Sequence, residues 1–186
     1  GQSIGVTEPS YSLYPVLAQI HEAGMFAVEL GEQWEIPQGF AEQLNRQQIP
    51  LALVVNPHAP SGRLTPAQRL AELAEQFNGV LLIDEAYVDF VDPELNYSTL
   101  PLVRNRDNVI ILRTLSKGYS LAGLRYGYGV GSETLIAALH KIRDSYNKDA
   151  IAQGMAVEAL RQQEYAAQTW RDVRSERSRL AAELLR

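Results

Sequence analysis

Short apolar runs alternate with amphipathic stretches along most of the chain. Four runs rich in Val, Ile and Leu stand at Met25–Leu30, Leu51–Val55, Val80–Ile83 and Val109–Leu112. Runs of this length without polar alternation are typical of buried parallel strands. A further strand-like segment, Ile4–Thr7, lies near the start of the sequence. The pattern therefore predicts several short strands, most of them parallel and buried.

Helical periodicity fills the intervals between these runs. Leu13–Glu22, Phe40–Gln48 and residues 70–77 carry apolar side chains at helical spacing. Thr65-Pro66-Ala67-Gln68 predicts a capping box at the start of the third helix. Since strands that alternate with helices are typical of α/β domains, we expect a three-layer α/β/α arrangement around a mostly parallel sheet.

The pattern becomes mainly helical after Gly131. Ser132 is expected to cap a helix that ends near Ile142, and Asp149–Gln163 predicts a second helix. A third helix carries one apolar stripe formed by Ala166, Trp170, Val173, Leu180 and Leu184. Its opposite face is rich in charges, which indicates a solvated surface.

Composition narrows the classes of function. The chain has 186 residues, of which 46% are hydrophobic and 21% charged, and its net charge is −5. Such a chain is typical of one globular domain, and its acidic balance argues against nucleic acid or an anionic membrane as the main partner. No apolar run approaches the ~20 residues of a membrane helix. We expect a cytoplasmic protein without membrane attachment.

Several kinds of site are excluded or disfavoured by residue types. The absence of cysteine excludes disulfides, thiolate catalysis and cysteine-bound zinc. The three histidines, His21, His58 and His140, stand far apart without metal-binding spacing, so no metal site is expected.

Polar groups follow three successive apolar runs. Asn56-Pro57-His58-Ala59-Pro60-Ser61-Gly62 follows the first, Asp84-Glu85-Ala86-Tyr87 the second, and Arg113-Thr114-Leu115-Ser116-Lys117-Gly118 the third. In open α/β sheets, ligands bind beyond the carboxyl ends of the strands. We therefore expect these segments to form one site at one edge of the sheet.

Individual residues leave several chemistries open. Lys117 suits either a phosphate contact or a Schiff base, and Asp84 suits either a magnesium ion or a protonated ring nitrogen. Arg125 could bind a phosphate bidentately, or simply be a surface arginine. No GxxxxGK[ST] loop is present, and Gly127–Gly131 lacks the GxGxxG spacing, which disfavours a nucleotide-binding domain and indicates a closely packed strand there.

Taken together, these motifs resemble the fold-type I pyridoxal-phosphate aminotransferases. The likeness rests on Ser116-Lys117, Ala122-Gly123-Leu124-Arg125 and Asp84-Glu85-Ala86-Tyr87, in the order of that family. Pro9-Ser10-Tyr11-Ser12-Leu13-Tyr14 and Arg113-Thr114-Leu115-Ser116-Lys117 are most similar to its histidinol-phosphate aminotransferase branch.

The resemblance implies a role for each matching residue. Lys117 would form the Schiff base with pyridoxal 5'-phosphate and act as the catalytic base. Asp84 would pair with the ring nitrogen, Tyr87 would donate to the ring hydroxyl, and Tyr11 would stack on the ring. The phosphate would be held by Thr114, Ser116 and Arg125. The implied partners are an amino donor, a 2-oxo acid and a second copy of the chain.

The sequence departs from the family pattern in one residue and in length. Ala59 occupies the place of an asparagine that contacts the ring hydroxyl, which leaves that contact to Tyr87 or His58. Since the family's members are roughly twice as long, we expect residues 1–163 to be a truncated cofactor-binding domain and residues 164–186 a helix leading toward a small C-terminal domain. On this view the isolated chain is inactive.

Three other functions stay open at the level of the sequence. A related pyridoxal-phosphate decarboxylase or lyase would use the same cofactor residues. A non-enzymatic module that senses the cofactor would use them without turnover. The third of these is an unrelated nucleotide-binding α/β domain, which the missing phosphate loop disfavours.

Overall fold

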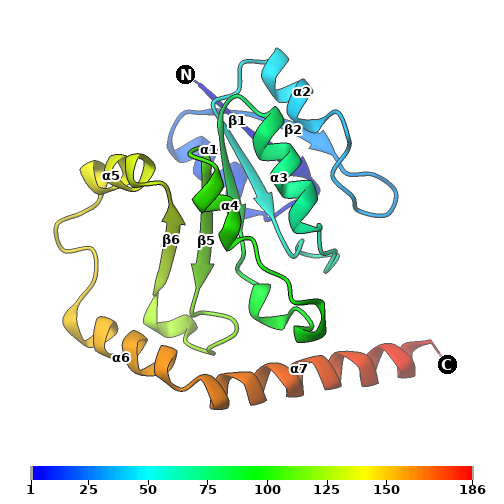
Figure 1. Cartoon of the computed structure of the whole chain (residues 1–186), viewed down its shortest axis with the longest axis vertical. Helices are drawn as coiled ribbons and strands as arrows, with labels where there is room; N and C mark the ends of the chain where they lie inside the picture. The colour runs from blue at the N-terminus through cyan, green and yellow to red at the C-terminus, as the bar shows by residue number, and fades with distance from the viewer. Residues whose placement is uncertain (1, 186) are drawn as a thin grey trace.

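The computed structural model describes residues 2–185. A six-stranded sheet lies at its centre, in the order β2-β1-β3-β4-β5-β6 (Figure 1). The strands are β1 (Ser3–Glu8), β2 (Gly24–Glu29), β3 (Leu51–Val55), β4 (Val80–Asp84), β5 (Val109–Thr114) and β6 (Gly127–Gly131). Neighbours from β2 to β5 pair in parallel, and β6 pairs antiparallel with β5. The expected α/β class with a mostly parallel sheet is confirmed.

Helices connect and flank the strands. They are α1 (Leu13–Ile20), α2 (Phe40–Arg46), α3 (Ala67–Gln76), α4 (Leu100–Asn105), α5 (Glu133–Ile142), α6 (Ala150–Arg161) and α7 (Gln163–Leu184). Three short 3-10 turns are η1 (Val88–Phe90), η2 (Pro93–Leu95) and η3 (Ala122–Leu124). Each predicted helix is present, with ends that differ from the prediction by a few residues.

The core forms two layers, one on each face of the sheet. Alternate residues of β3 point to opposite faces, so Ala52 and Val54 join one buried cluster while Leu53 and Val55 join the other. The larger cluster includes side chains from α2, α3 and α4, and the smaller includes Tyr14 of α1. These two clusters account for the three-layer arrangement that the sequence predicts.

One predicted helix cap is present and one is wrong. The Ser132 hydroxyl accepts a hydrogen bond from the Leu135 backbone N–H, as expected for the start of α5. Thr65 does not cap α3, which begins after Pro66 with no side-chain cap. The reason is tertiary: Thr65 is buried, and its backbone N–H donates to Asn56 Oδ1 at 2.7 Å.

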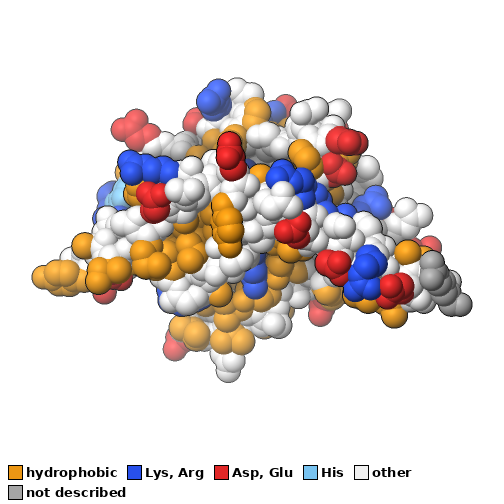
Figure 2. Space-filling model, turned by 90° about the horizontal axis from the view of Figure 1, so that it is seen from below, with side chains coloured by type: hydrophobic (Ala, Val, Ile, Leu, Met, Phe, Trp, Pro, Cys, Tyr) orange, Lys and Arg blue, Asp and Glu red, His pale blue; other side chains and the backbone are white. Residues whose placement is uncertain are grey.

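The C-terminal helices contribute little to the core. α6 and α7 run past the carboxyl end of β5 (Figure 1). Of the 22 residues of α7, only Ala166 is buried. Along the predicted apolar stripe, Trp170 is partly buried, whereas Leu180 and Leu184 are exposed. Seen from below, this side of the molecule carries broad hydrophobic areas with charges between them (Figure 2). Within residues 2–185, no helix is both long and apolar enough to cross a membrane.

Candidate functional site

A cavity of about 500 Å³ lies at the carboxyl ends of β3, β4 and β5. All seven residues predicted for the site line it, together with Ala59: they are Tyr11, Asp84, Tyr87, Thr114, Ser116, Lys117 and Arg125. Residues that are up to 114 positions apart in the sequence, from Tyr11 to Arg125, therefore meet at one edge of the sheet.

The register of the strands brings these groups together. Asp84 of β4 pairs with Val55 of β3 on one side and with Leu112 of β5 on the other. Backbone hydrogen bonds continue past the strand ends, with Asn56 N–H donating to Asp84 O and Glu85 N–H donating to Leu112 O, both at 2.8 Å. Asp84 and Thr114 are thus the last residues of their strands, and Tyr87, Ser116 and Lys117 follow those strands within three residues.

The carboxylate of Asp84 is held by two donors. The Tyr14 hydroxyl donates to Oδ2 at 2.9 Å, and the Ala86 backbone N–H donates to Oδ1 at 3.0 Å. Burial raises the pKa of the Tyr14 hydroxyl far above its usual value, and the neighbouring Asp84 adds to this effect. Tyr14 therefore keeps its proton and remains a hydrogen-bond donor to the carboxylate.

Lys117 is exposed on a tightly anchored loop. Its Nζ lies 5.4 Å from the centre of the Tyr87 ring, within the range of a cation–π contact. The next residue, Gly118, is buried, and a Cβ atom there would collide with the Asp89 carboxylate. The carbonyl of Gly118 accepts from the indole N–H of Trp170 at 2.7 Å. An exposed amine is thus attached to a backbone that these contacts hold in place.

Hydroxyl groups and a guanidinium lie on another side of the cavity. The hydroxyls of Thr114 and Ser116 are 2.9 Å apart, and the Ser116 backbone N–H donates to Thr114 Oγ1 at 3.1 Å. Arg125 is exposed, has a left-handed backbone with φ of 54°, and donates from Nη1 to Ala122 O at 2.8 Å. Two hydroxyls and a cation in one wall suit an anion such as phosphate.

The two candidates for the ring-hydroxyl contact occupy different places. Tyr87 lines the cavity, whereas His58 does not. His58 is buried, with Nδ1 2.8 Å from Ser61 Oγ and Nε2 2.9 Å from Pro9 O. Both ring nitrogens of His58 are therefore engaged, Nδ1 within its own loop and Nε2 by the connection between β1 and α1. Of the two, Tyr87 is the residue placed to face a bound ligand beside Ala59.

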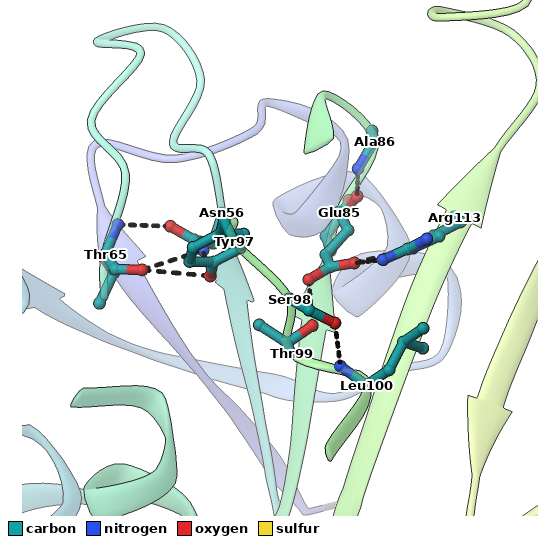
Figure 3. Close-up of polar contacts among 10 residues, drawn as sticks. Asn56, Thr65, Glu85, Ala86, Tyr97, Ser98, Thr99, Leu100 and Arg113 are labelled. Atoms are coloured by element: carbon teal, nitrogen blue, oxygen red, sulfur yellow. Dashed lines mark hydrogen bonds and ion pairs between the residues drawn. The ribbon is translucent and has the colours of Figure 1, made fainter. Parts of the chain in front are cut away.

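The sequence analysis did not predict an ion pair between Arg113, which lines the cavity, and the buried Glu85. Both Nε and Nη2 of Arg113 lie 2.8 Å from Glu85 Oε2, and the Thr99 hydroxyl donates to the other carboxylate oxygen (Figure 3). Burial opposes the charge of Arg113, but the ion pair with Glu85 outweighs it and raises the pKa of Arg113. The only local signal was a pair of charged residues, Glu85 and Arg113, beside two buried strands.

A second carboxyl group lies near this ion pair. Burial raises the pKa of Asp89 to about 6, an effect that Arg113 opposes and Glu85 reinforces. Among residues 2–185, no group of three or more His, Asp or Glu side chains is arranged to hold a metal ion.

A second buried network fixes the loop after β3. Asn56 is fully buried, and its side-chain amide donates to Thr65 O and to the Tyr97 hydroxyl, which itself donates to Thr65 O at 3.1 Å (Figure 3). Asn56 is thus structural, and it holds in place the loop that carries Ala59.

Two comparisons place the chain among known proteins. The family model for aminotransferase class I and II matches residues 1–185. A histidinol-phosphate aminotransferase from Rhodopirellula baltica is 42% identical over 90% of this chain and 44% of its own length. One from Crocosphaera subtropica is 39% identical over 99% of this chain and 51% of its own length. The chain thus spans about half the length of these curated relatives.

Solved structures agree with this assignment. The histidinol-phosphate aminotransferase from Sinorhizobium meliloti, in complex with pyridoxal-5'-phosphate, has a TM-score of 0.89 and 27% identity over 97% of this chain and 50% of its own. A decarboxylase from Sulfurospirillum multivorans, with a TM-score of 0.85 and 22% identity over 99% of this chain and 55% of its own, shares the fold alone. With a family model that matches almost every residue and relatives near 40% identity, the chain belongs to the aminotransferase class I and II family.

Proposed function

We propose that the chain is the cofactor-binding part of a pyridoxal-phosphate-dependent aminotransferase that takes histidinol phosphate as amino donor and a 2-oxo acid as acceptor. The observation that carries this proposal is the meeting of Lys117, Asp84 and the Thr114–Ser116–Arg125 group in one cavity. The named relatives support the substrate, since they are histidinol-phosphate aminotransferases.

The residues present fit the cofactor. A cavity of about 500 Å³ is within the ordinary range for small-molecule sites, ~300–1,000 Å³. The cofactor has an aldehyde, a basic ring nitrogen, a ring hydroxyl and a phosphate. The cavity offers an amine from Lys117, a carboxylate from Asp84 and a phenol from Tyr87. For the phosphate it offers the hydroxyls of Thr114 and Ser116 and the guanidinium of Arg125.

Each residue then has a defined task. Pyridoxal phosphate, when bound, supplies an electron sink that stabilises a carbanion at the substrate Cα. Asp84 would keep a proton on the ring nitrogen, with its carboxylate held by Tyr14 and Ala86. Lys117 would hold the cofactor aldehyde through Nζ, and its free amine would take the proton from the substrate Cα.

Ala59 weakens the site without disabling it. A side-chain amide that contacts the ring hydroxyl is absent at this position, so Tyr87 is the remaining donor. Loss of one hydrogen bond costs about 0.5–1.5 kcal/mol. We therefore expect slightly weaker cofactor binding, which an Ala59→Asn variant would strengthen.

The proposal also covers what lies outside this segment. Residues 1–163 would be the cofactor-binding domain, and residues 164–186 would lead toward a smaller domain. The carboxylate of the 2-oxo acid and the phosphate of histidinol phosphate would be bound by parts of a longer polypeptide, which would act as a homodimer in the cytoplasm. The isolated chain would then bind the cofactor but not complete a turnover.

An amine-transfer assay tests this function. The full-length polypeptide that contains this segment, mixed with histidinol phosphate and 2-oxoglutarate, should form glutamate only when both substrates are present. The Lys117→Ala variant should lower this rate at least a thousandfold, and the isolated chain should show no turnover. Release of carbon dioxide from an amino acid offered in place of histidinol phosphate, without amine transfer, would show a decarboxylase instead. Turnover by the isolated chain would refute the proposed need for the missing parts.

A further inference from the structure

We propose that Tyr14 is a positioning residue that fixes two cofactor-facing side chains at once, the Asp84 carboxylate and the Tyr11 ring. This inference rests on the proposed function, because it concerns how this chain holds pyridoxal phosphate. No part of Tyr14 lines the cavity. It acts through residues that do.

The first contact is to the group that faces the ring nitrogen. Tyr14 lies in the first turn of α1 and is only 6% exposed, packed in the cluster with Val6, Leu53 and Val55. Its hydroxyl reaches Asp84 Oδ2 at 2.9 Å, across 70 residues of sequence. Since the Ala86 N–H occupies Oδ1, each carboxylate oxygen has its own donor. Without Tyr14, one oxygen would lose its partner and the carboxylate could rotate.

The second contact is to the group that stacks on the ring. The rings of Tyr11 and Tyr14 are 5.7 Å apart at 89°, an edge-to-face arrangement. The Tyr14 backbone N–H also donates to Tyr11 O at 3.1 Å. Tyr11 itself is 47% exposed, so few other atoms restrain its ring. The buried Tyr14 ring therefore provides a fixed surface for it.

The position of Tyr14 explains how one side chain does both. Tyr11 lies two residues before α1 and lines the cavity, whereas Tyr14 lies in the first turn of α1 and packs in the buried cluster with residues of the sheet. The hydroxyl of Tyr14 remains protonated because burial and Asp84 both raise its pKa. The contact is therefore a constant support and not a pH switch.

A tyrosine-to-phenylalanine pair tests the inference. Tyr14→Phe keeps the ring against Tyr11 and removes only the hydroxyl. Tyr97→Phe is the matched control, because it also removes a partly buried hydroxyl that bonds to other groups, Asn56 and Thr65, outside the cavity. Cofactor affinity is measured by titration with pyridoxal phosphate and the visible absorption band, with thermal unfolding of each variant as a check of folding.

We expect Tyr14→Phe to weaken cofactor binding on the order of tenfold, as for a lost hydrogen bond to a charged group. Tyr97→Phe should change binding less than about twofold while lowering stability. In an Asp84→Ala background, Tyr14→Phe should change binding less than about twofold, because its partner is gone. Tyr14→Leu, which also removes the ring beside Tyr11, should reduce the visible circular dichroism of the bound cofactor further than Tyr14→Phe does.

The outcomes separate this inference from the proposed function. If the wild-type protein gives no visible band and no reducible link at Lys117, the proposed function fails. If the wild type binds and Tyr14→Phe binds equally well, the positioning role of Tyr14 is refuted and the function stands. Equal weakening by Tyr97→Phe, or an undiminished effect without the Asp84 carboxylate, would likewise overturn the inference. Should Tyr14→Phe not fold, the circular dichroism of Tyr14→Leu against Tyr97→Phe decides the same question.

Discussion

The sheet and the C-terminal helices differ sharply in how they bury apolar side chains. Four of the five residues of β3 are buried, whereas α7 buries one of its 22 residues. The candidate site belongs to the sheet region, since none of its lining residues comes from α5, α6 or α7. Asp84, Thr114 and Lys117 stand on or next to strands with buried cores, while Trp170 of α7 only braces the loop after Lys117. The contrast indicates that the sheet sets both the stability of the chain and the geometry of the site.

Removing a core ring should give the largest effect. Phe40 is 1% exposed and lies in the larger cluster, against the sheet. Phe40→Ala should lower the free energy of unfolding by about 3–5 kcal/mol, through lost burial and a new cavity. Urea unfolding followed by circular dichroism measures this loss. A decrease below about 1 kcal/mol would mean that the sheet region is not the stable core.

The buried ion pair should come next. Glu85→Ala leaves the Arg113 guanidinium without its carboxylate and the Thr99 hydroxyl without its acceptor. The expected loss is about 3 kcal/mol, at the lower end for a broken buried pair because Arg113 is partly exposed. Replacing both charged residues, in Glu85→Leu with Arg113→Leu, should recover much of the loss. No recovery in the double variant would contradict an origin in the unpaired charge.

The pH dependence of stability tests the carboxyl group beside this pair. The pKa of Asp89 is about 6 in the folded chain against 3.8 ordinarily, so between these values the folded state binds more protons than the unfolded state. Stability from this group is complete below about pH 4 and is lost as pH rises through about 6. The contribution of Asp89 to the free energy of unfolding is at most ~3 kcal/mol, for a pKa raised by about two. Partial exposure of the carboxyl group should reduce this contribution to about 1–2 kcal/mol.

An Asp89→Asn variant isolates that contribution. Its free energy of unfolding should fall less steeply than that of the wild type between pH 4 and 7, as measured by urea unfolding at several pH values. Parallel pH profiles for the two proteins would show that Asp89 titrates normally.

The smallest effect should come from the exposed helix. Leu180 in α7 is 51% exposed, although it belongs to the apolar stripe of the sequence. Leu180→Ala should change the free energy of unfolding by less than about 0.5 kcal/mol, as at other surface positions. A loss comparable to that of Phe40→Ala would remove the difference between the two regions.

The sequence predicts those features of the fold and the site that are determined by residues close to one another along the chain. The strand positions follow from apolar runs, and five site residues, Asp84, Tyr87, Thr114, Ser116 and Lys117, lie in the polar segments after those runs. Tyr11 and Arg125 are assigned from the resemblance to a family and not from this pattern. The direction of β6 does not follow from the pattern either, because antiparallel pairing with β5 is decided by the turn around η3 and not by the Gly127–Gly131 segment itself.

What the sequence missed depends on distant partners. The Thr65 capping box satisfied every local rule, but the side chain of Asn56 binds the Thr65 backbone instead. The contacts of Tyr14 with Asp84 and of Glu85 with Arg113 join residues 70 and 28 positions apart. Neither contact produces a periodic pattern in the sequence, so both are recognised only in the folded structure.

Mapping the covalent link to pyridoxal phosphate tests the central claim most directly. The chain has three lysines, Lys117, Lys141 and Lys148, which makes the assignment simple. Lys141 lies in α5, and Lys148 is half-buried and donates to the carbonyl of Arg125. The protein would be titrated with the cofactor, reduced with borohydride, digested, and examined by mass spectrometry. We predict a single labelled peptide carrying the cofactor on Lys117. Label distributed over Lys141 and Lys148, or none on Lys117, would contradict a cofactor site at this edge of the sheet.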